Sequence, residues 1–240
     1  MTEMMDRMEK RIQLIFLPFA GGDGNSFRQL TELLNPRIEC FTVAYSGRGK
    51  RRQEPLFTEY VPFIRDVERQ IQEVRKPELP FAVLGYSAGG VFTYDLLSRG
   101  VIEGKLLHTF ICSKGRISGD VPSSHWWELS DEEFAQYMRH LGGIDERILR
   151  DERFRAIYLK PIKADYRVYD EYVFCPGKIP SDITCIYSPK DEIADGVVDW
   201  KQLTDGNVDF YPMGENHFFI YYHWEDVAKI INSKLNKYLA

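Results

Sequence analysis

The sequence predicts an α/β fold in which a mostly parallel sheet carries helices on both faces. Two observations support this prediction. First, short apolar runs alternate with stretches of helical periodicity in the first half of the chain. Second, the same alternation of strands and helices returns near the C-terminus. The chain has 240 residues, enough for one large domain of this class, and we expect residues 1–240 to form a single domain.

Six short apolar runs are the expected strands. The first ends in Pro18–Gly22, a tight loop, and the third is followed at once by a helical segment. The runs are Ile12–Leu17, Ile38–Val43, Phe81–Leu84, Leu106–Cys112, Ile183–Tyr187 and Val208–Tyr211.

Four segments have helical spacing, and one longer region interrupts the rhythm. The helical segments are Ser26–Leu34, Tyr60–Val74, Ala88–Ser98 and Trp224–Leu239. The region of about 115–172 contains no convincing strand and is rich in aromatic residues. A helical insertion between two strands is where a lid over an active site is expected. Plain core packing of the same aromatic residues is the alternative interpretation.

Composition excludes several classes of function. The net charge of −5 gives no reason to expect a nucleic-acid partner, because phosphate binding needs a concentrated positive surface. The four cysteines match no zinc or redox spacing and predict free thiols in a reducing compartment. The N-terminus does not resemble a signal peptide, and no apolar stretch approaches the roughly 20 residues that span a bilayer. We therefore expect a cytoplasmic protein, acting as a monomer away from membranes.

The sharpest motif is Gly85–Gly89, with the sequence G-Y-S-A-G. A strand precedes it directly and a helix follows directly, as in the nucleophile elbow of α/β-hydrolases. Such a turn presents the hydroxyl of Ser87 clear of the sheet, beside the positive end of the helix dipole. Ser87 is therefore the predicted nucleophile, and the alternative is a plain strand–helix turn that uses glycine for close packing.

A serine nucleophile needs a base, and elbow enzymes place it after the last strand. His217 lies in that position and is the predicted base. His108 precedes the expected acid, and His223 lies beside the final helix, as a surface or capping residue. The remaining histidines, His125 and His140, fall in the predicted lid.

The acid that orients the base should follow the fifth strand. Asp191 is the first carboxylate there, and its expected role is to fix the tautomer of His217 without taking the proton. Glu192 and Asp195 are rivals, and their alternative role is a solvated acidic loop, with Asp195 as a possible N-cap.

An oxyanion hole requires two backbone N–H donors. One is expected from Ala88, the residue after the nucleophile. The other is expected from the loop after the first strand, where we favour Ala20, with Phe19 as the alternative.

Taken together, several segments resemble the type II (external, editing) thioesterases of nonribosomal peptide and polyketide synthesis. Singly none of these segments is decisive, but in this order they are specific. They are Phe16–Phe27, Ser46–Gly49, Gly85–Gly90, Leu141–Gly143, Pro161–Tyr166 with the later Tyr172, and Gly214–Phe219.

The resemblance implies a reaction and a partner. The family hydrolyses acyl or aminoacyl thioesters on the phosphopantetheine arm of carrier domains, so the arm enters with the substrate and neither a bound cofactor nor a metal is expected. A small-ester or chain-releasing serine hydrolase is the first alternative. A non-catalytic binding protein with a hydrolase fold is the second.

Departures from the family pattern fall near the nucleophile and the acid. Tyr86 stands where the family often has His, and Ala88 where it often has Met, so both are expected to alter the pocket floor and with it the acyl preference. Ser46 and Ser188 replace a usual Pro and a usual Gly. The basic stretch Lys50–Arg52, with Arg48, is either a contact for an acidic carrier domain or a solvated loop.

Overall fold

Six parallel strands form a single sheet in the computed structural model, which describes residues 9–119, 124–142 and 152–239, without the side chains of 152–156. The strand order is β2-β1-β3-β4-β5-β6, and every neighbouring pair is parallel, which confirms the predicted sheet. The strands are β1 (Ile12–Leu17), β2 (Ile38–Thr42), β3 (Phe81–Tyr86), β4 (Leu106–Cys112), β5 (Ile183–Tyr187) and β6 (Val208–Pro212).

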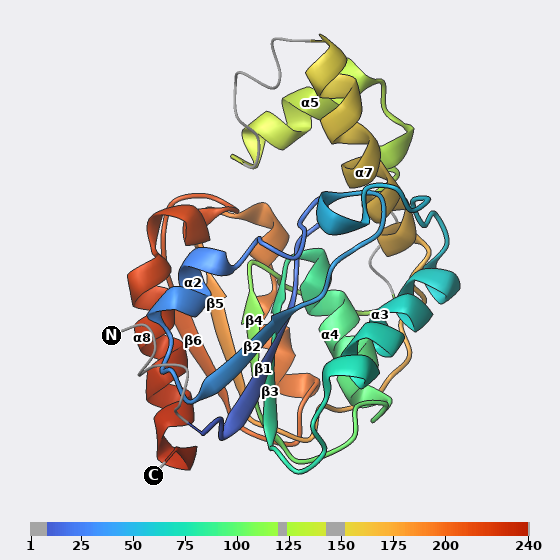
Figure 1. Ribbon diagram of the computed structural model, residues 1–240. Coiled ribbons are helices and arrows are strands. Elements are labelled where there is room, and N and C mark those ends of the chain that lie inside the picture. Colours follow the sequence, from blue (N-terminus) through green and yellow to red (C-terminus); the bar gives the residue numbers. More distant parts are fainter. Residues whose placement is uncertain (1–8, 120–123, 143–151, 240) are drawn as a thin grey trace.

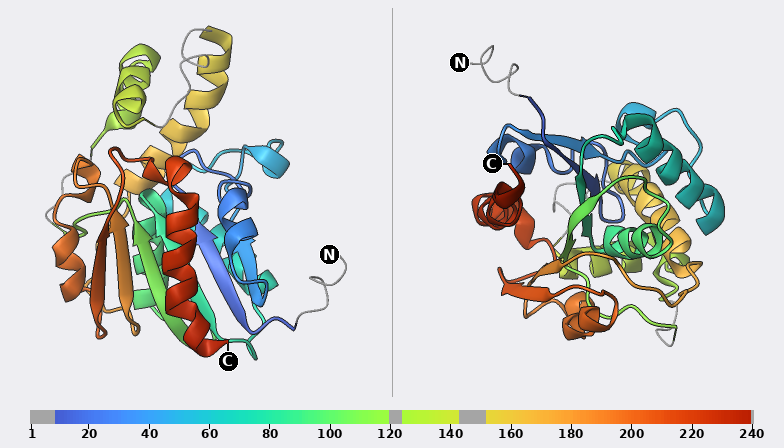
Figure 2. Two further views of the ribbon diagram at one scale, coloured as in Figure 1. Left: turned by 90° about the vertical axis from the view of Figure 1, so that its left-hand side faces the viewer. Right: turned by 90° about the horizontal axis from the view of Figure 1, so that it is seen from below.

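Helices cover both faces of this sheet (Figures 1 and 2). One face carries α2 (Arg28–Leu33) and α8 (Trp224–Leu235), and the other carries α3 (Tyr60–Val74) and α4 (Ala88–Ser98). Side chains of β1 alternate between the two cores: Leu14 and Phe16 join the core under α8, and Ile15 and Leu17 join the core under α4. Because the central strands are buried on both faces, their sequences are continuous apolar runs and do not alternate between apolar and polar residues.

The helix boundaries differ slightly from the sequence predictions. α2 begins at Arg28 instead of Ser26, because the Ser26 hydroxyl accepts a hydrogen bond from the Asp23 amide and closes a turn there. At the C-terminus, α8 ends at Leu235 and a 3₁₀ turn, Asn236–Tyr238, continues the chain.

Two helices lie above the carboxyl ends of the strands (Figure 1). They are α5 (Asp131–His140), which begins with a capping box formed by Ser130 and Glu133, and α7 (Glu152–Asp170). The described residues of 115–172 contain helices and no strand. Phe134 and Leu159 are buried and belong to the same continuous hydrophobic cluster as the core side chains on the α8 face of the sheet. Part of this layer therefore packs as core.

Other features of the described residues concern membrane helices, metal sites and thiols. Among the described residues, no helix is long and apolar enough to cross a membrane, and no cluster of side chains suits a metal ion. All four cysteines are free thiols. Cys112 and Cys185 are buried, and burial raises the pKa of each thiol.

His108 is a buried histidine in β4 that takes no part in the sheet edge. Its Nε2 lies 2.8 Å from Thr184 Oγ1, and its ring packs on Phe110. Burial lowers the pKa of His108 to about 4. The unfolded chain therefore binds a proton on this side chain more readily than the folded chain does, and stability falls as the pH drops below about 6.5.

We expect His108→Gln to weaken the acid sensitivity of folding. Between pH 7 and pH 5, His108 should lower the free energy of unfolding by about 2 kcal/mol in the wild type, and the variant should lack this contribution. Urea unfolding at the two pH values measures the difference. Equal losses in the two proteins would show that His108 is not buried in its neutral form.

Candidate active site

Ser87 sits in a strained turn between β3 and α4. Its φ of +54° and ψ of −118° lie outside the regions that L-residues favour. A Cβ on Gly85 would lie 2.4 Å from the Gly89 carbonyl oxygen, and one on Gly89 would lie 2.1 Å from the Leu17 carbonyl oxygen. The turn can therefore form only with glycine at both positions, which is the constraint expected for a nucleophile elbow.

The structure brings the three predicted side chains together. Ser87 Oγ lies 2.9 Å from His217 Nε2, and His217 Nδ1 lies 2.7 Å from Asp191 Oδ2. All three residues are buried. With the carboxylate at Nδ1, the proton of the neutral imidazole resides on that nitrogen, and Nε2 is free to accept the serine proton.

Asp191 is held in place by its own turn. Its Oδ1 accepts a hydrogen bond of 3.1 Å from the Ile193 amide, which leaves Oδ2 for the histidine. The rivals point elsewhere. Glu192 is exposed, with a carboxylate oxygen 3.9 Å from His140. Asp195 is exposed and ends a 3₁₀ turn, and Gly196 begins the next one, so the N-cap interpretation of Asp195 is wrong.

Two buried hydroxyls hold the backbone of His217. The Tyr86 hydroxyl donates to the His217 carbonyl oxygen at 2.6 Å, and the Ser113 hydroxyl lies 2.7 Å from the same oxygen. Burial raises the pKa of Tyr86 well above its usual value, so the phenol stays protonated as a donor. Tyr86 is fully buried and packs on Phe218, so it does not form the pocket floor, and that expectation is wrong.

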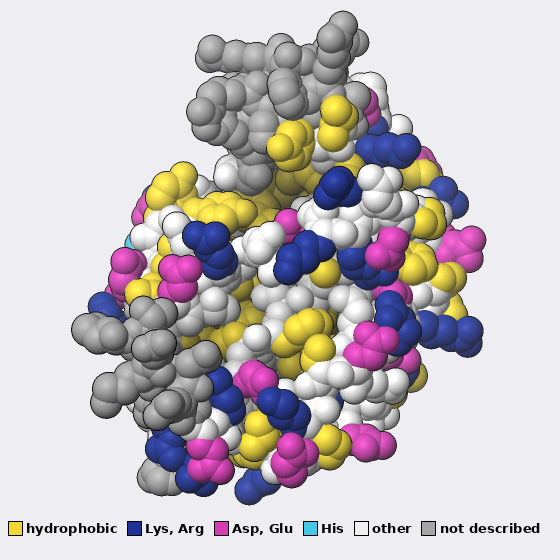
Figure 3. Space-filling model, in the orientation of Figure 1, with side chains coloured by type: hydrophobic (Ala, Val, Ile, Leu, Met, Phe, Trp, Pro, Cys, Tyr) yellow, Lys and Arg dark blue, Asp and Glu magenta, His cyan; other side chains and the backbone are white. Residues whose placement is uncertain are grey.

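A cavity of about 490 Å³ opens beside the nucleophile. Ser87, Ala88 and Ala20 line one side of it. Aromatic side chains of the upper layer line another side: Trp126, Tyr137, Tyr166 and Tyr169. Hydrophobic side chains are visible in the hollow below that layer in Figure 3. The cavity can therefore hold an apolar chain next to Ser87.

The loop after β1 is tied to α7. The Gly21 amide donates to Asp165 Oδ2 at 2.7 Å, and Arg48 makes a bidentate ion pair with the same carboxylate. Gly21 has a φ of +86°, and a Cβ there would lie 2.5 Å from Ile162. Ala20, the preferred second donor, lines the cavity, whereas Phe19 is buried in the core.

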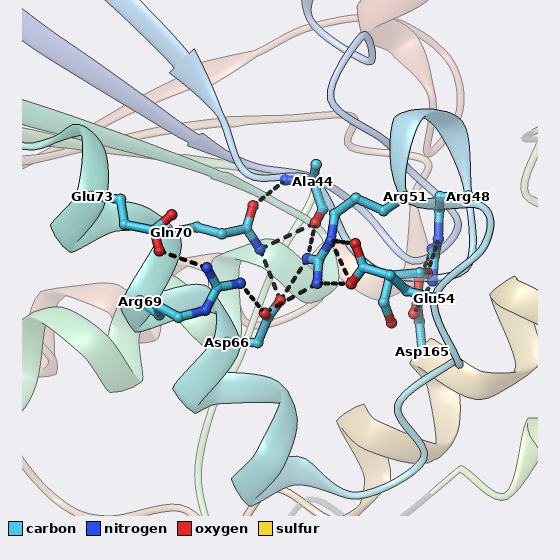
Figure 4. A network of polar contacts seen from close by, with 10 residues as sticks. Ala44, Arg48, Arg51, Glu54, Asp66, Arg69, Gln70, Glu73 and Asp165 are labelled. Atoms are coloured by element: carbon cyan, nitrogen blue, oxygen red, sulfur yellow. Dashed lines mark hydrogen bonds and ion pairs between the residues drawn. The ribbon is translucent and has the colours of Figure 1, made fainter.

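Two arginines of the basic stretch, Arg48 and Arg51, are paired with carboxylates of the protein. Arg48 and Asp165 are almost fully buried, with side chains 9% and 3% exposed. Arg51 pairs with Glu54 and with Asp66 (Figure 4). Both arginines therefore serve internal ion pairs, which is unlike a solvated loop. Lys50 and Arg52 are exposed, and a contact of this stretch with a carrier domain stays a prediction.

Sequence reasoning missed Tyr86, Ser113 and Asp165 as supports of the site. Each acts through a partner more than 100 positions away in the sequence. The segment Pro161–Tyr166 marks Asp165 as part of the family resemblance, but the sequence gives no sign of its contact with Gly21.

We expect Tyr86→Phe to slow the reaction of Ser87 with a fluorophosphonate probe by about fivefold. The reason is that the carbonyl of His217 loses one buried hydrogen bond, worth about 1 kcal/mol, and the imidazole is held less firmly. The matched control is Tyr94→Phe, which removes a hydroxyl bonded to the Cys175 and Gly177 carbonyls. If both variants react at the same rate, the Tyr86 hydroxyl does not position the histidine.

Comparison with known proteins agrees with this geometry. The sequence matches the thioesterase domain family over residues 12–235. It is 27% identical to gramicidin S biosynthesis protein GrsT of Aneurinibacillus migulanus, with 96% of this chain and 91% of GrsT covered. It is 25% identical to thioesterase PikA5 of Streptomyces venezuelae, with 93% of this chain and 81% of PikA5 covered.

A solved structure shows the same architecture. The type II thioesterase BorB from the borrelidin biosynthetic cluster superposes with a TM-score of 0.82 at 25% identity, with 95% of each chain covered. The predicted hydrolase fold and the resemblance to type II thioesterases are thereby confirmed. The chain belongs to the thioesterase domain family.

Proposed function

We propose that this protein is a type II thioesterase that hydrolyses acyl or aminoacyl thioesters from the carrier domains of a nonribosomal peptide or polyketide synthase. The observation that supports it best is the hydrogen-bonded series Ser87–His217–Asp191, which ends at an aromatic-lined cavity. The similarity to GrsT and BorB, whose names refer to gramicidin S and borrelidin biosynthesis, supports the carrier-bound substrate.

In the acylation step, Ser87 Oγ attacks the thioester carbonyl while His217 Nε2 takes the hydroxyl proton. The tetrahedral intermediate then collapses, the carbon–sulfur bond breaks, and His217 returns the proton to the leaving thiolate. Asp191 stabilises the imidazolium in both steps. Water, activated by the same histidine, releases the acid from acyl-Ser87 and regenerates the enzyme.

The oxyanion of the tetrahedral intermediate must accept hydrogen bonds from two backbone N–H groups. We propose the N–H groups of Ala88 and Ala20 as its donors, because both residues line the cavity beside Ser87. Neither amide has a protein acceptor in the described part of the chain, so both can bind a ligand. Phe19, the alternative, does not line this cavity, so we favour the Ala20 amide over the Phe19 amide.

This mechanism uses only side chains and amides of the protein. The phosphopantetheine arm arrives as part of the substrate, so the proposed reaction needs neither a bound cofactor nor a metal. The carrier domain must deliver the arm to a buried serine, and the layer formed by α5 and α7 stands over that route (Figure 1). Movement of this layer as a lid is part of the proposal.

We expect Ser87→Ala to abolish hydrolysis of acyl-loaded carrier protein while the fold persists. Removal of a triad nucleophile lowers kcat by about 10⁶ in a well-studied serine hydrolase. Intact-protein mass spectrometry of carriers with different acyl groups, before and after exposure to the enzyme, measures the loss of the acyl mass.

The same assay separates the alternatives. Rapid turnover of nitrophenyl esters with loaded carriers left intact would point to a small-ester hydrolase. Carrier binding without any turnover by the wild type would point to a non-catalytic binding protein. Either result contradicts the proposed thioesterase function.

We expect Asp165→Asn to lower kcat by about tenfold or more, with a smaller change in KM. The substitution leaves Arg48 buried without its counter-charge and loosens the Gly21 amide, so the Ala20 donor moves away from the oxyanion. The matched control is Asp66→Asn, which breaks the ion pair of Arg51 away from the cavity. Equal kcat values in the two variants would show that Asp165 does not position this loop.

A further inference from the structure

Lys114 is a buried cation in the wall of the cavity that holds Ser87. It follows β4 directly, two residues after the strand ends at Cys112, whose carbonyl oxygen accepts the Ser87 amide at 2.8 Å. The residue is 7% exposed and lines the cavity together with Ser87 and Ala88. Its ammonium group is therefore part of the surface that an acyl group bound to Ser87 would meet.

The protein holds Lys114 rigidly. The Trp200 indole donates to the Lys114 carbonyl oxygen at 2.9 Å, and Trp200 is fully buried. On the other side, the Lys114 Cβ packs against Gly90 in the first turn of α4, 3.1 Å from where a Cβ on that glycine would be. This close packing places the stem of the side chain against the helix that begins at the nucleophile.

The Lys114 ammonium has more N–H donors than the described side chains engage. Nζ donates to the Tyr169 hydroxyl at 2.9 Å and lies 5.2 Å from the centre of the same ring. An ammonium carries three N–H donors, and Tyr169 is its sole side-chain partner within the described residues. Tyr169 also lines the cavity, so the Lys114 ammonium that donates to its hydroxyl lies at the cavity wall.

Lys114 has no ion-pair partner among the residues that the structure describes. Within the described ranges, no carboxylate oxygen lies within 4.0 Å of its Nζ. Glu192 and Asp195 also line the cavity, but both are exposed to solvent. Asp199 lies 3.8 Å from Arg116. A buried charge is unfavourable without a partner, so an anionic group of the ligand would supply what the protein lacks.

We propose that Lys114 binds a carboxylate on the acyl group, so that the enzyme favours thioesters of dicarboxylic acids. This inference rests on the proposed thioesterase function and names its substrate class. The phosphate of the phosphopantetheine arm is the other anion of such a substrate, but the whole pantetheine chain separates it from the thioester. Lys114 packs beside the elbow, where the acyl carbon must lie, and so favours the acyl carboxylate.

The test uses N-acetylcysteamine thioesters of malonic, succinic, glutaric and adipic acids, each compared with the methyl ester of its free carboxyl group. The two members of a pair are similar in size and differ in charge, and these substrates contain no phosphate. Thiol release measures thioester cleavage alone. For at least one chain length, kcat/KM of the wild type should be about tenfold to a hundredfold higher for the free acid, as expected for a hydrogen bond between charged groups.

The variants assign this preference to the ammonium. Lys114→Met should reduce the ratio of free acid to methyl ester to about one, and Lys114→Arg should retain a ratio above one, because the charge remains. The matched control is Lys105→Met, an exposed lysine next to the opposite end of β4, which should keep the wild-type ratio.

Several results would overturn the inference. A ratio of about one in the wild type, with good turnover of the methyl esters, removes the carboxylate site and leaves the thioesterase function intact. A defect of Lys114→Met that is confined to neutral acyl groups on phosphopantetheine assigns the lysine to the phosphate. If the wild type cleaves no thioester, free or carrier-bound, the proposed function fails and the carboxylate site fails with it.

Discussion

The close contact between the elbow and the end of β1 is the constraint on which the site depends. Gly89 lies so near the Leu17 carbonyl oxygen that no side chain fits between them. This contact places the loop after β1 directly beside the first turn of α4, where Ala20 and Ala88 line one cavity. The strained backbone of Ser87 is the local consequence, and the surrounding sheet holds that strain in place.

The end of β3 positions both Ser87 and His217, the proposed nucleophile and base. Tyr86 points to the face of the sheet under α8, where its hydroxyl holds the backbone carbonyl of His217. The hydroxyl of Ser87, the next residue, lies 2.9 Å from Nε2 of the His217 imidazole. The histidine is thus held at two points by consecutive residues, and Asp191 holds it at a third. This arrangement reduces the freedom of the ring before substrate arrives.

Much of the fold and the three side chains of the proposed triad could be predicted from the sequence, because local patterns encode them. Apolar runs mark strands that are buried on both faces, and the G-Y-S-A-G turn carries its own geometric requirement. His217 and Asp191 could be proposed from their positions after the last and the fifth strand, although the sequence also offered Glu192 and Asp195 as the acid. Tyr86, Ser113 and Asp165 could not be found this way, because their partners depend on which segments meet in space. Arg48 looked like part of a basic surface for the same reason, because its acidic partner Asp165 on α7 is 117 positions away. Arg51 has nearer partners, Glu54 and Asp66, but their pairing with it also depends on how the chain folds.

In the proposed mechanism, the acyl group is transferred to Ser87 before water releases it. Rapid acid quenching during turnover of an acyl-loaded carrier, followed by peptide mass mapping, tests this most directly. We expect a peptide that contains Ser87 to gain the mass of the acyl group, and the gain to disappear as the free acid forms. An acyl adduct that forms and decays at the rate of turnover on any other residue would contradict the account.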